Sequence, residues 1–124
     1  MEKKYELLYD QVVSMARDKD IYYIRALKDF GDVKKGDVGG FVESENNLSQ
    51  EGNCWIDRTS KSMGSSIVCG DTIVGNYTDI IDSFVCGNSI IHSSRIHNSI
   101  ISSASIYSSY IHDSRISNAA MQIC

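Results

Sequence analysis

Aliphatic residues return at short, regular steps through the second half of the chain, and this pattern predicts most of the fold. The steps are five or six residues long from Ile56 to Met121, and eleven of the thirteen aligned residues are Ile or Val. The aligned positions are Ile56, Ser62, Val68, Val74, Ile80, Val85, Ile91, Ile96, Ile101, Ile106, Ile111, Ile116 and Met121. Repeats this short are typical of a solenoid in which each unit packs only against its neighbours.

Small residues occupy the position two before each aliphatic residue, where the chain must bend into a narrow interior. They are Cys54, Ser60, Ser66, Thr72, Thr78, Ser83, Ser89, Ser94, Ser99, Ala104, Ser109, Ser114 and Ala119. Asn and Asp, which tolerate tight backbone turns, recur at the expected corners. These corner residues are Asn76, Asp82, Asn88, Asn98, Asp113 and Asn118. We therefore expect short parallel strands about 4.8 Å apart.

The residue before each aliphatic position points outward, because side chains alternate along a strand. Sorting these residues by threes separates two apolar faces from one polar face. One face collects Trp55, Ile73, Ile90, Ser105 and Ala120; a second collects Ile67, Phe84, Ile100 and Arg115; the third collects Lys61, Asp79, Arg95 and Tyr110. Sorting by fours mixes apolar and charged residues. The pattern thus favours a left-handed triangular parallel β-helix of about four coils, with a right-handed pentapeptide-repeat β-helix as the alternative.

The first 53 residues lack the repeat and are expected to form a small α+β cap on the solenoid of residues 54–124, as one folding unit. Tyr5, Leu8, Val12 and Met15 fall at helical spacing, which predicts a helix over 2–17. Strands are expected over 21–30 and 41–43, with a turn between them and a polar connector over 44–53. We expect this segment to close the first end of the solenoid, with its helix covering one apolar face.

Residues 21–60 also carry motifs found elsewhere. The stretch Ala-Leu-Lys-Asp-Phe-Gly-Asp-Val-Lys-Lys-Gly-Asp-Val-Gly-Gly-Phe-Val-Glu spans 26–43, and Asn-Leu-Ser at 47–49 and Gly-Asn-Cys-Trp at 52–55 follow it. This module resembles the N-terminal part of a family of phage and prophage proteins that continue into hexapeptide-like β-helical repeats. The resemblance implies a β-helix and a phage origin. The chain departs from that family's Val-x-Gly-Asn-Ala units, because Ser and Ile dominate here and many units have five residues.

Composition and charge narrow the partners that we expect. Sixteen acidic residues against twelve basic ones leave a net charge of −4, and no basic cluster marks a nucleic-acid interface. The chain holds neither the roughly 20 apolar residues that span a membrane nor the apolar core of a signal peptide, so we expect it in the cytoplasm of a bacterial host. The four cysteines form no Cys-x-x-Cys pair, which predicts reduced thiols and neither metal nor cofactor.

These expectations favour a binding protein that is not an enzyme. The resemblance leads by analogy to an inhibitor of a host defence protein, such as an anti-CRISPR, that acts by steric binding through an outer face. The candidate contact residues are Ile67, Phe84, Ile100 and Tyr110, with Trp55, Ile73 and Ile90 as the alternative face. An uncovered apolar face or the open last coil also predicts a homo-oligomer, with a dimer favoured.

Two other functions stay open. Hexapeptide β-helices often serve acyl transfer with a histidine as general base, and His92, His97 and His112 are the candidates here. Alternatively, an oligomer could bind a nucleotide or nucleic acid through sparse positive charge. The basic residues of the repeats are Arg58, Lys61, Arg95 and Arg115.

Overall fold

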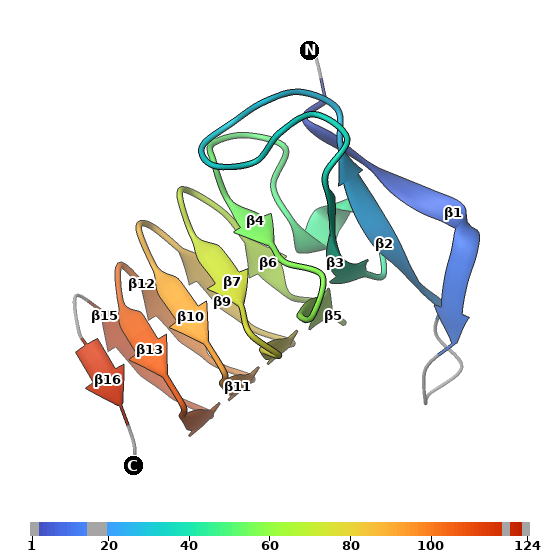
Figure 1. Ribbon diagram of the computed structural model, residues 1–124. Helices are drawn as coiled ribbons and strands as arrows, with labels where there is room; N and C mark the ends of the chain where they lie inside the picture. Colours follow the sequence, from blue (N-terminus) through green and yellow to red (C-terminus); the bar gives the residue numbers. More distant parts are fainter. Residues whose placement is uncertain (1–2, 15–19, 118–119, 123–124) are drawn as a thin grey trace.

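The structure, a computed structural model, describes residues 3–14, 20–117 and 120–122, and almost all of them belong to strands or tight turns. The N-terminal segment forms strands β1 (Tyr5–Ser14), β2 (Asp20–Ala26) and β3 (Val38–Val42), followed by one 3-10 turn, η2 (Glu45–Asn47). Thirteen short strands then make up the repeats (Figure 1). Within the described residues, no helix has the length and hydrophobicity that a bilayer crossing requires.

The helix predicted over 2–17 is wrong wherever the structure describes this segment. β1 pairs antiparallel with β2, so that Tyr5 lies opposite Ala26 and Val13 lies opposite Ile21, with an irregularity between Leu7 and Val12. The apolar residues of this segment fit a strand as well as a helix, and short apolar segments are ambiguous in this way. Pairing with β2 decides between them, because the ladder satisfies the backbone groups of both strands.

The repeats form a left-handed, three-sided β-helix, as predicted (Figure 1). Its strands are β4 (Trp55–Ile56), β5 (Lys61–Met63), β6 (Ile67–Val68), β7 (Ile73–Gly75), β8 (Asp79–Ile81), β9 (Phe84–Cys86), β10 (Ile90–His92), β11 (Arg95–His97), β12 (Ile100–Ser102), β13 (Ser105–Tyr107), β14 (Tyr110–His112), β15 (Arg115–Ser117) and β16 (Ala120–Gln122). Each strand pairs in parallel with the strand three places along the chain. Three strands complete one coil, which excludes the four-sided alternative and gives a little over four coils.

The three sheets match the three predicted sets of outward residues. Strands β5, β8, β11 and β14 carry the polar face. We call β4, β7, β10, β13 and β16 the first apolar face, and β6, β9, β12 and β15 the second apolar face. The inward aliphatic residues from Ile56 to Ile106 are fully buried and form one continuous core.

Hydroxyl groups of the small corner residues connect successive coils. The backbone N–H of Ser94 donates to Thr78 Oγ1 at 3.3 Å, and that of Ser109 donates to Ser94 Oγ at 3.1 Å. A second row repeats this contact at another corner, where Ser99 N–H donates to Ser83 Oγ at 3.0 Å. Ser and Thr therefore recur at these corner positions for two reasons. The corner is too narrow for a large side chain, and the buried backbone N–H of the next coil needs a hydrogen-bond acceptor.

Left-handed backbone conformations turn the chain at the corners. Asn76, Asp82, Asn98 and Asp113 have φ angles of 53°, 50°, 51° and 50°, as their residue types predicted. At the corner that contains Asn88, Gly87 has the positive φ instead, at 82°. The predicted corner residue Asn118 lies outside the described residues.

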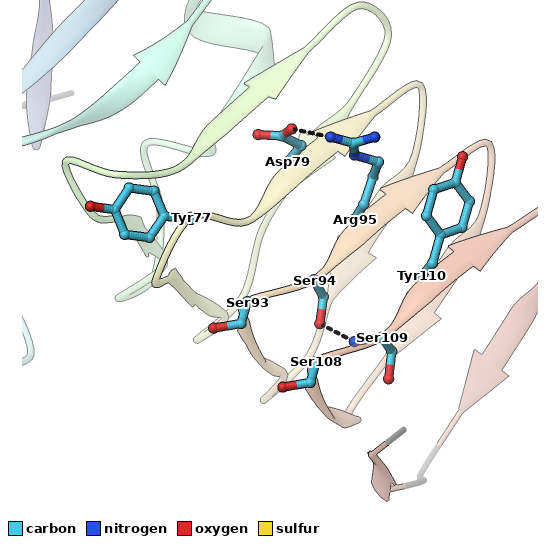
Figure 2. A pocket seen from close by; sticks show the side chains of 8 residues that line it. All are labelled: Tyr77, Asp79, Ser93, Ser94, Arg95, Ser108, Ser109 and Tyr110. Carbon is cyan, nitrogen blue, oxygen red and sulfur yellow. Dashed lines mark hydrogen bonds and ion pairs between the residues drawn. The ribbon is translucent and has the colours of Figure 1, made fainter. Parts of the chain in front are cut away.

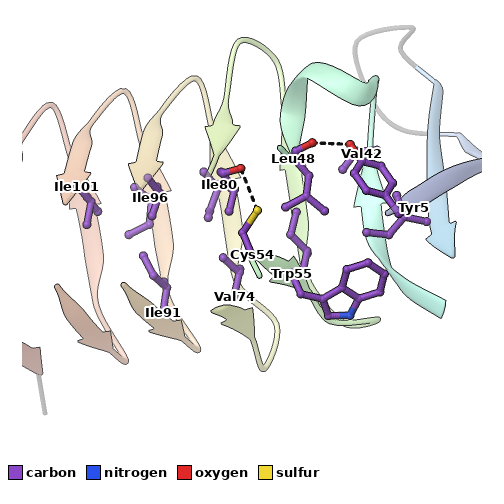
Figure 3. Packing of buried hydrophobic residues seen from close by; sticks show 14 of the residues in the cluster. Tyr5, Val42, Leu48, Cys54, Trp55, Val74, Ile80, Ile91, Ile96 and Ile101 are labelled. Atoms are coloured by element: carbon purple, nitrogen blue, oxygen red, sulfur yellow. Dashed lines mark hydrogen bonds between the residues drawn. The ribbon is translucent and has the colours of Figure 1, made fainter. Parts of the chain in front are cut away.

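The N-terminal segment closes the first coil and, of the outward residues of the two apolar faces, covers only Trp55 at the start of the first. Strands β1, β2 and β3 extend the sheet of the polar face through the β3–β5 pairing. Tyr5, Val42 and Leu48 continue the core of the coils into this cap (Figure 3). The expected covering of an apolar face is therefore wrong, because the segment adds strands edge to edge instead of packing a helix across a sheet.

The cysteines differ from the sequence expectation. Cys69 and Cys86 occupy equivalent places one coil apart and form a disulfide, with their Cα atoms 4.6 Å apart. Reduced thiols were expected for this pair, and the expectation is wrong because the register of β6 and β9 stacks the two side chains. Cys54 is a free, buried thiol, and Cys124 lies outside the described residues.

Candidate functional site

The polar face brings together most of the reactive side chains in the coils. The first residue of each of its strands points outward, and strand pairing stacks Lys61, Asp79, Arg95 and Tyr110 in one column. Asp79 lies between two cations, 3.8 Å from Lys61 Nζ and 3.7 Å from an Arg95 guanidinium nitrogen. The guanidinium side chain is 60% exposed, so it remains accessible to a ligand while it contacts Asp79.

A shallow groove of about 440 Å³ runs beside this column, and Figure 2 shows its lining residues. They are Tyr77, Asp79, Ser93, Ser94, Arg95, Ser108, Ser109 and Tyr110. Ser94 and Ser109 are buried members of the hydroxyl row, whereas Ser93 and Ser108 are exposed at the corner. Tyr77 and Tyr110 are 78% and 62% exposed at opposite ends of the groove. The groove is therefore polar along its floor and aromatic at its ends.

Two of the three predicted histidines lie on the same polar face. His97 and His112 are the third residues of β11 and β14, and strand pairing places their rings with centroids 5.1 Å apart. The ring of Tyr110 lies 6.3 Å from that of His112. The imidazole pair thus lies at the end of β11 and β14, whereas the groove lies at their start, and Tyr110 is the groove residue whose ring is near His112.

A carboxylate orients the second of these imidazoles. His112 Nδ1 lies 2.9 Å from Asp113 Oδ2, and the other Asp113 oxygen accepts a hydrogen bond from the side-chain amide of Asn98. A carboxylate beside Nδ1 favours the tautomer with the proton on Nδ1. In that tautomer, Nε2 carries a free lone pair, so His112 is arranged to accept a proton from a substrate.

The third histidine lies at the other edge of the polar face, at the corner that also carries Ser93 and Ser108 of the groove. His92 is the last residue of β10 on the first apolar face, with its Nδ1 3.2 Å from Asn76 Nδ2 and its ring 5.4 Å from that of Tyr107. Its partners are an amide and a phenol, so it lacks the direct carboxylate contact that orients His112. The structure therefore separates His92 from the pair on the polar face.

A fixed carboxylate lies at this same corner, one coil before Asn76. Asp57 accepts hydrogen bonds from Thr59 N at 2.9 Å, Thr59 Oγ1 at 2.7 Å and Asn76 N at 3.1 Å. Burial raises the pKa of the Asp57 carboxyl, but these bonds together outweigh burial and hold the pKa below its ordinary value. Asp57 is therefore an ionised turn-forming residue.

The cap contains an ionisable pair that the sequence did not reveal. Lys4 is 1% exposed, and its Nζ donates to the carbonyl oxygen of Cys54 at 2.8 Å and lies 3.2 Å from the Cys54 sulfur. Burial lowers the pKa of Lys4, and Cys54 partly offsets this effect. Burial likewise raises the pKa of the Cys54 thiol. Because both side chains are enclosed, we assign this pair to the stability of the cap.

The predicted partner-contact residues divide among all three faces. Ile67, Phe84 and Ile100 are 39%, 44% and 42% exposed in one column of the second apolar face. Ile73 and Ile90 are 41% and 37% exposed on the first apolar face.

The two aromatic members of that set lie apart from these columns. Trp55 is only 8% exposed, because its ring packs against Phe30 with centroids 5.3 Å apart. Tyr110 lies on the polar face with the groove. The expected homodimer and the expected foreign partner stay predictions.

Sequence reasoning missed Tyr77, Asn98 and Asp113 as members of the site. The signal for two of them is present: His-Asn at 97–98 and His-Asp at 112–113 stand fifteen residues apart, which is one coil of five-residue units. Among the described residues, no three His, Cys, Asp or Glu side chains are placed to hold a metal ion together. The site is therefore built from one oriented imidazole and a polar groove.

No protein-family model matches the chain. Part of it is similar to an Escherichia coli (strain K12) protein named "Uncharacterized acetyltransferase YdcK", with 44% identity over 50 residues, which are 40% of this chain and 15% of that protein. The match is compatible with hexapeptide-like repeats and gives no support to a phage origin or an anti-defence role. It also corrects the expectation that the chain is not an enzyme, because the similar protein is named for an enzymatic activity.

Proposed function

We propose that the chain is an acyltransferase-type β-helix whose polar face transfers an acyl group to a polar acceptor. The contact between His112 and Asp113, on the same face as an open polar groove, is the observation that carries this proposal. An imidazole held by a carboxylate is the usual arrangement of a general base. The groove supplies a place for the acceptor within reach of the same face.

In the proposed reaction, the acceptor is a hydroxyl or amine that lies in the groove near His112. Nε2 of His112 takes the acceptor's proton as the oxygen or nitrogen attacks the carbonyl carbon of an acyl thioester. The tetrahedral intermediate then expels the thiolate, which recovers the proton from His112. Asp113 stabilises the imidazolium during both steps, and Asn98 keeps the carboxylate in place.

The choice of an acetyl thioester as donor rests on the name of the similar protein. The match covers 15% of that protein, so its activity extends to this chain only as a proposal. The test therefore uses acetyl-coenzyme A as donor together with a panel of acceptors that carry hydroxyl or amino groups.

Acetylated product detected by mass spectrometry measures the transfer directly. We expect His112→Gln to reduce product formation by about 100-fold or more, since general-base catalysis contributes about 10²–10⁴-fold. His92→Gln is the matched control, because the His92 ring contacts Asn76 and Tyr107 at the end of β10 in place of a carboxylate, and it should retain the activity of the unmodified chain. No transfer to any acceptor, or equal losses in the two variants, would overturn the proposal.

A further inference from the structure

Tyr77 has a backbone conformation that a bulky side chain rarely adopts. Its φ angle is 63°, and the preceding Asn76 also has a positive φ, of 53°. Asn tolerates this region, whereas for a large aromatic residue it is an outlier. The ring is 78% exposed, so packing does not compensate for the unfavourable backbone. Such outliers persist only where the surrounding structure enforces them, and they cluster at functional sites.

Tyr77 and Tyr110 lie at the two ends of the groove in Figure 2. Tyr77 precedes β8 and Tyr110 begins β14, with β11 between these two strands. Two strand spacings separate the rings along the coil axis, which is about 10 Å. Between them lie the carboxylate of Asp79, the guanidinium of Arg95 and the exposed hydroxyl groups of Ser93 and Ser108.

We propose that this groove binds an extended, uncharged oligosaccharide that runs along the coil axis. A tyrosine ring offers a flat apolar surface for the C–H face of a sugar ring, and its hydroxyl group stays in water. Planar carboxylate and guanidinium groups can each pair with two neighbouring hydroxyl groups of a sugar.

The geometry favours a chain over a single sugar. A sugar ring in an extended β-linked chain advances by a length close to one strand spacing. Three successive rings would therefore lie over Tyr77, the coil of Arg95, and Tyr110.

The charges of the groove favour a neutral ligand. Its charged lining residues are Asp79 and Arg95, whose charges balance, and an Arg95 guanidinium nitrogen lies 3.7 Å from the Asp79 carboxylate. A polyphosphate or a nucleic-acid strand would bring negative charge against Asp79, which like-charge repulsion disfavours.

This inference rests on the proposed function for the role of the groove as acceptor site, but binding can be measured without turnover. Cellotriose and tri-N-acetylchitotriose serve as extended, uncharged β-linked probes, and maltotriose, which is curved, is the comparison ligand. We expect the extended probes to shift the backbone amide signals of Ser93, Arg95 and Ser108 in an NMR titration. Maltotriose should bind at least tenfold more weakly.

Two variants test the aromatic ends. Tyr77→Asn and Tyr110→Ala should each weaken binding of the extended probes at least tenfold. Tyr9→Asn changes a tyrosine that is 64% exposed on β1, outside the groove, and should leave binding unchanged. Because Asn accepts a positive φ, Tyr77→Asn should melt at the same or a higher temperature than the unmodified chain, which separates lost binding from lost folding.

The outcomes for binding and catalysis are separable. His112→Gln should keep the binding of the extended probes while it loses acyl transfer. If the unmodified chain binds the extended probes but transfers no acyl group, the proposed function is refuted and this inference is not. Two results would overturn the inference. In the first, the chain transfers acyl groups but neither extended probe shifts the amide signals of the groove. In the second, the Tyr77 and Tyr110 variants bind the probes as tightly as the unmodified chain does.

Discussion

The cap and the coils are held together in different ways. In the coils, the same few contacts recur at each turn: a buried aliphatic residue, a parallel ladder and a hydroxyl that accepts from the next coil. In the cap, each contact occurs once and joins residues far apart in the sequence. The Tyr5 hydroxyl donates to Leu48 and Glu45 carbonyls, and Asn47 Nδ2 donates to the Gly64 and Ser66 carbonyls at 3.1 and 2.9 Å.

This difference decides how each region responds to the loss of one polar contact. A repeated contact spreads its contribution over many equivalent positions, so its loss at one turn leaves the neighbouring turns intact. A contact that occurs once in the cap has no equivalent to replace it. Matched variants in the two regions can be compared by their free energy of unfolding.

The largest effect is expected in the core of the coils. Ile96 is fully buried in the middle coils, so Ile96→Ala should lower the free energy of unfolding by about 2–5 kcal/mol through lost burial and a cavity. Ile90→Ala removes a residue that is 37% exposed on the first apolar face and should cost much less. Chemical denaturation measures both, and equal losses would contradict the assignment of inward and outward positions.

A polar contact in the cap should come second. Tyr5→Phe keeps the ring but removes the hydroxyl that donates to Leu48 and Glu45 carbonyls, at a cost of about 2 kcal/mol because those groups lose a partner in the cap. Tyr9→Phe is the control, since Tyr9 is 64% exposed. A loss no larger than that of the control would show that the cap does not depend on this contact.

One hydroxyl of the coils should matter less than the cap tyrosine. Ser83 Oγ accepts from the backbone N–H of Ser99 at 3.0 Å and donates to the Ile81 carbonyl at 2.8 Å. Ser83→Ala should cost about 1 kcal/mol, and Ser105→Ala, on the outer surface of β13, should be close to neutral. If Ser83→Ala cost more than Tyr5→Phe in thermal or chemical melts, the proposed contrast between repeated and single contacts would fail.

The smallest effect should depend on pH. The folded state holds the pKa of Asp57 below its ordinary value, so the ionised carboxylate stabilises the protein above the ordinary aspartate pKa. That contribution is lost as the pH falls through the lowered pKa. Asp57→Asn should cost less than about 1 kcal/mol near neutral pH, and the gap to the unmodified chain should shrink as the solution is acidified. A gap that does not change with pH in denaturation experiments would refute this role.

The coils could be predicted in detail because their pattern is local. The inward Ile and Val residues, the small corner residues and the three outward columns follow from spacing alone, and strand pairing reproduces those columns. The cap could not be predicted as well. Residues 5–14 suit a helix or a strand, and only the contact with β2 favours the strand.

The site was predicted in part. Three histidines were candidates, but sequence spacing alone did not separate His92 from the stacked His97 and His112. The contact between His112 and Asp113 depends on the left-handed turn at Asp113, which directs the carboxylate back toward the ring. The groove depends on residues from three coils, which no single repeat contains.

The sequence by itself determined the three-sided solenoid, the position of its core and the division into one polar and two apolar faces. Burial of one aliphatic residue per strand, at steps of five or six, leaves few other ways to hide those side chains from water. The tertiary structure alone decided the strand conformation of the N-terminal segment, the Cys69–Cys86 disulfide, the contact between His112 and Asp113, and the assembly of the groove from three coils. These features arise from contacts between distant residues, whose geometry is fixed only once the coils have stacked and the cap has paired with them.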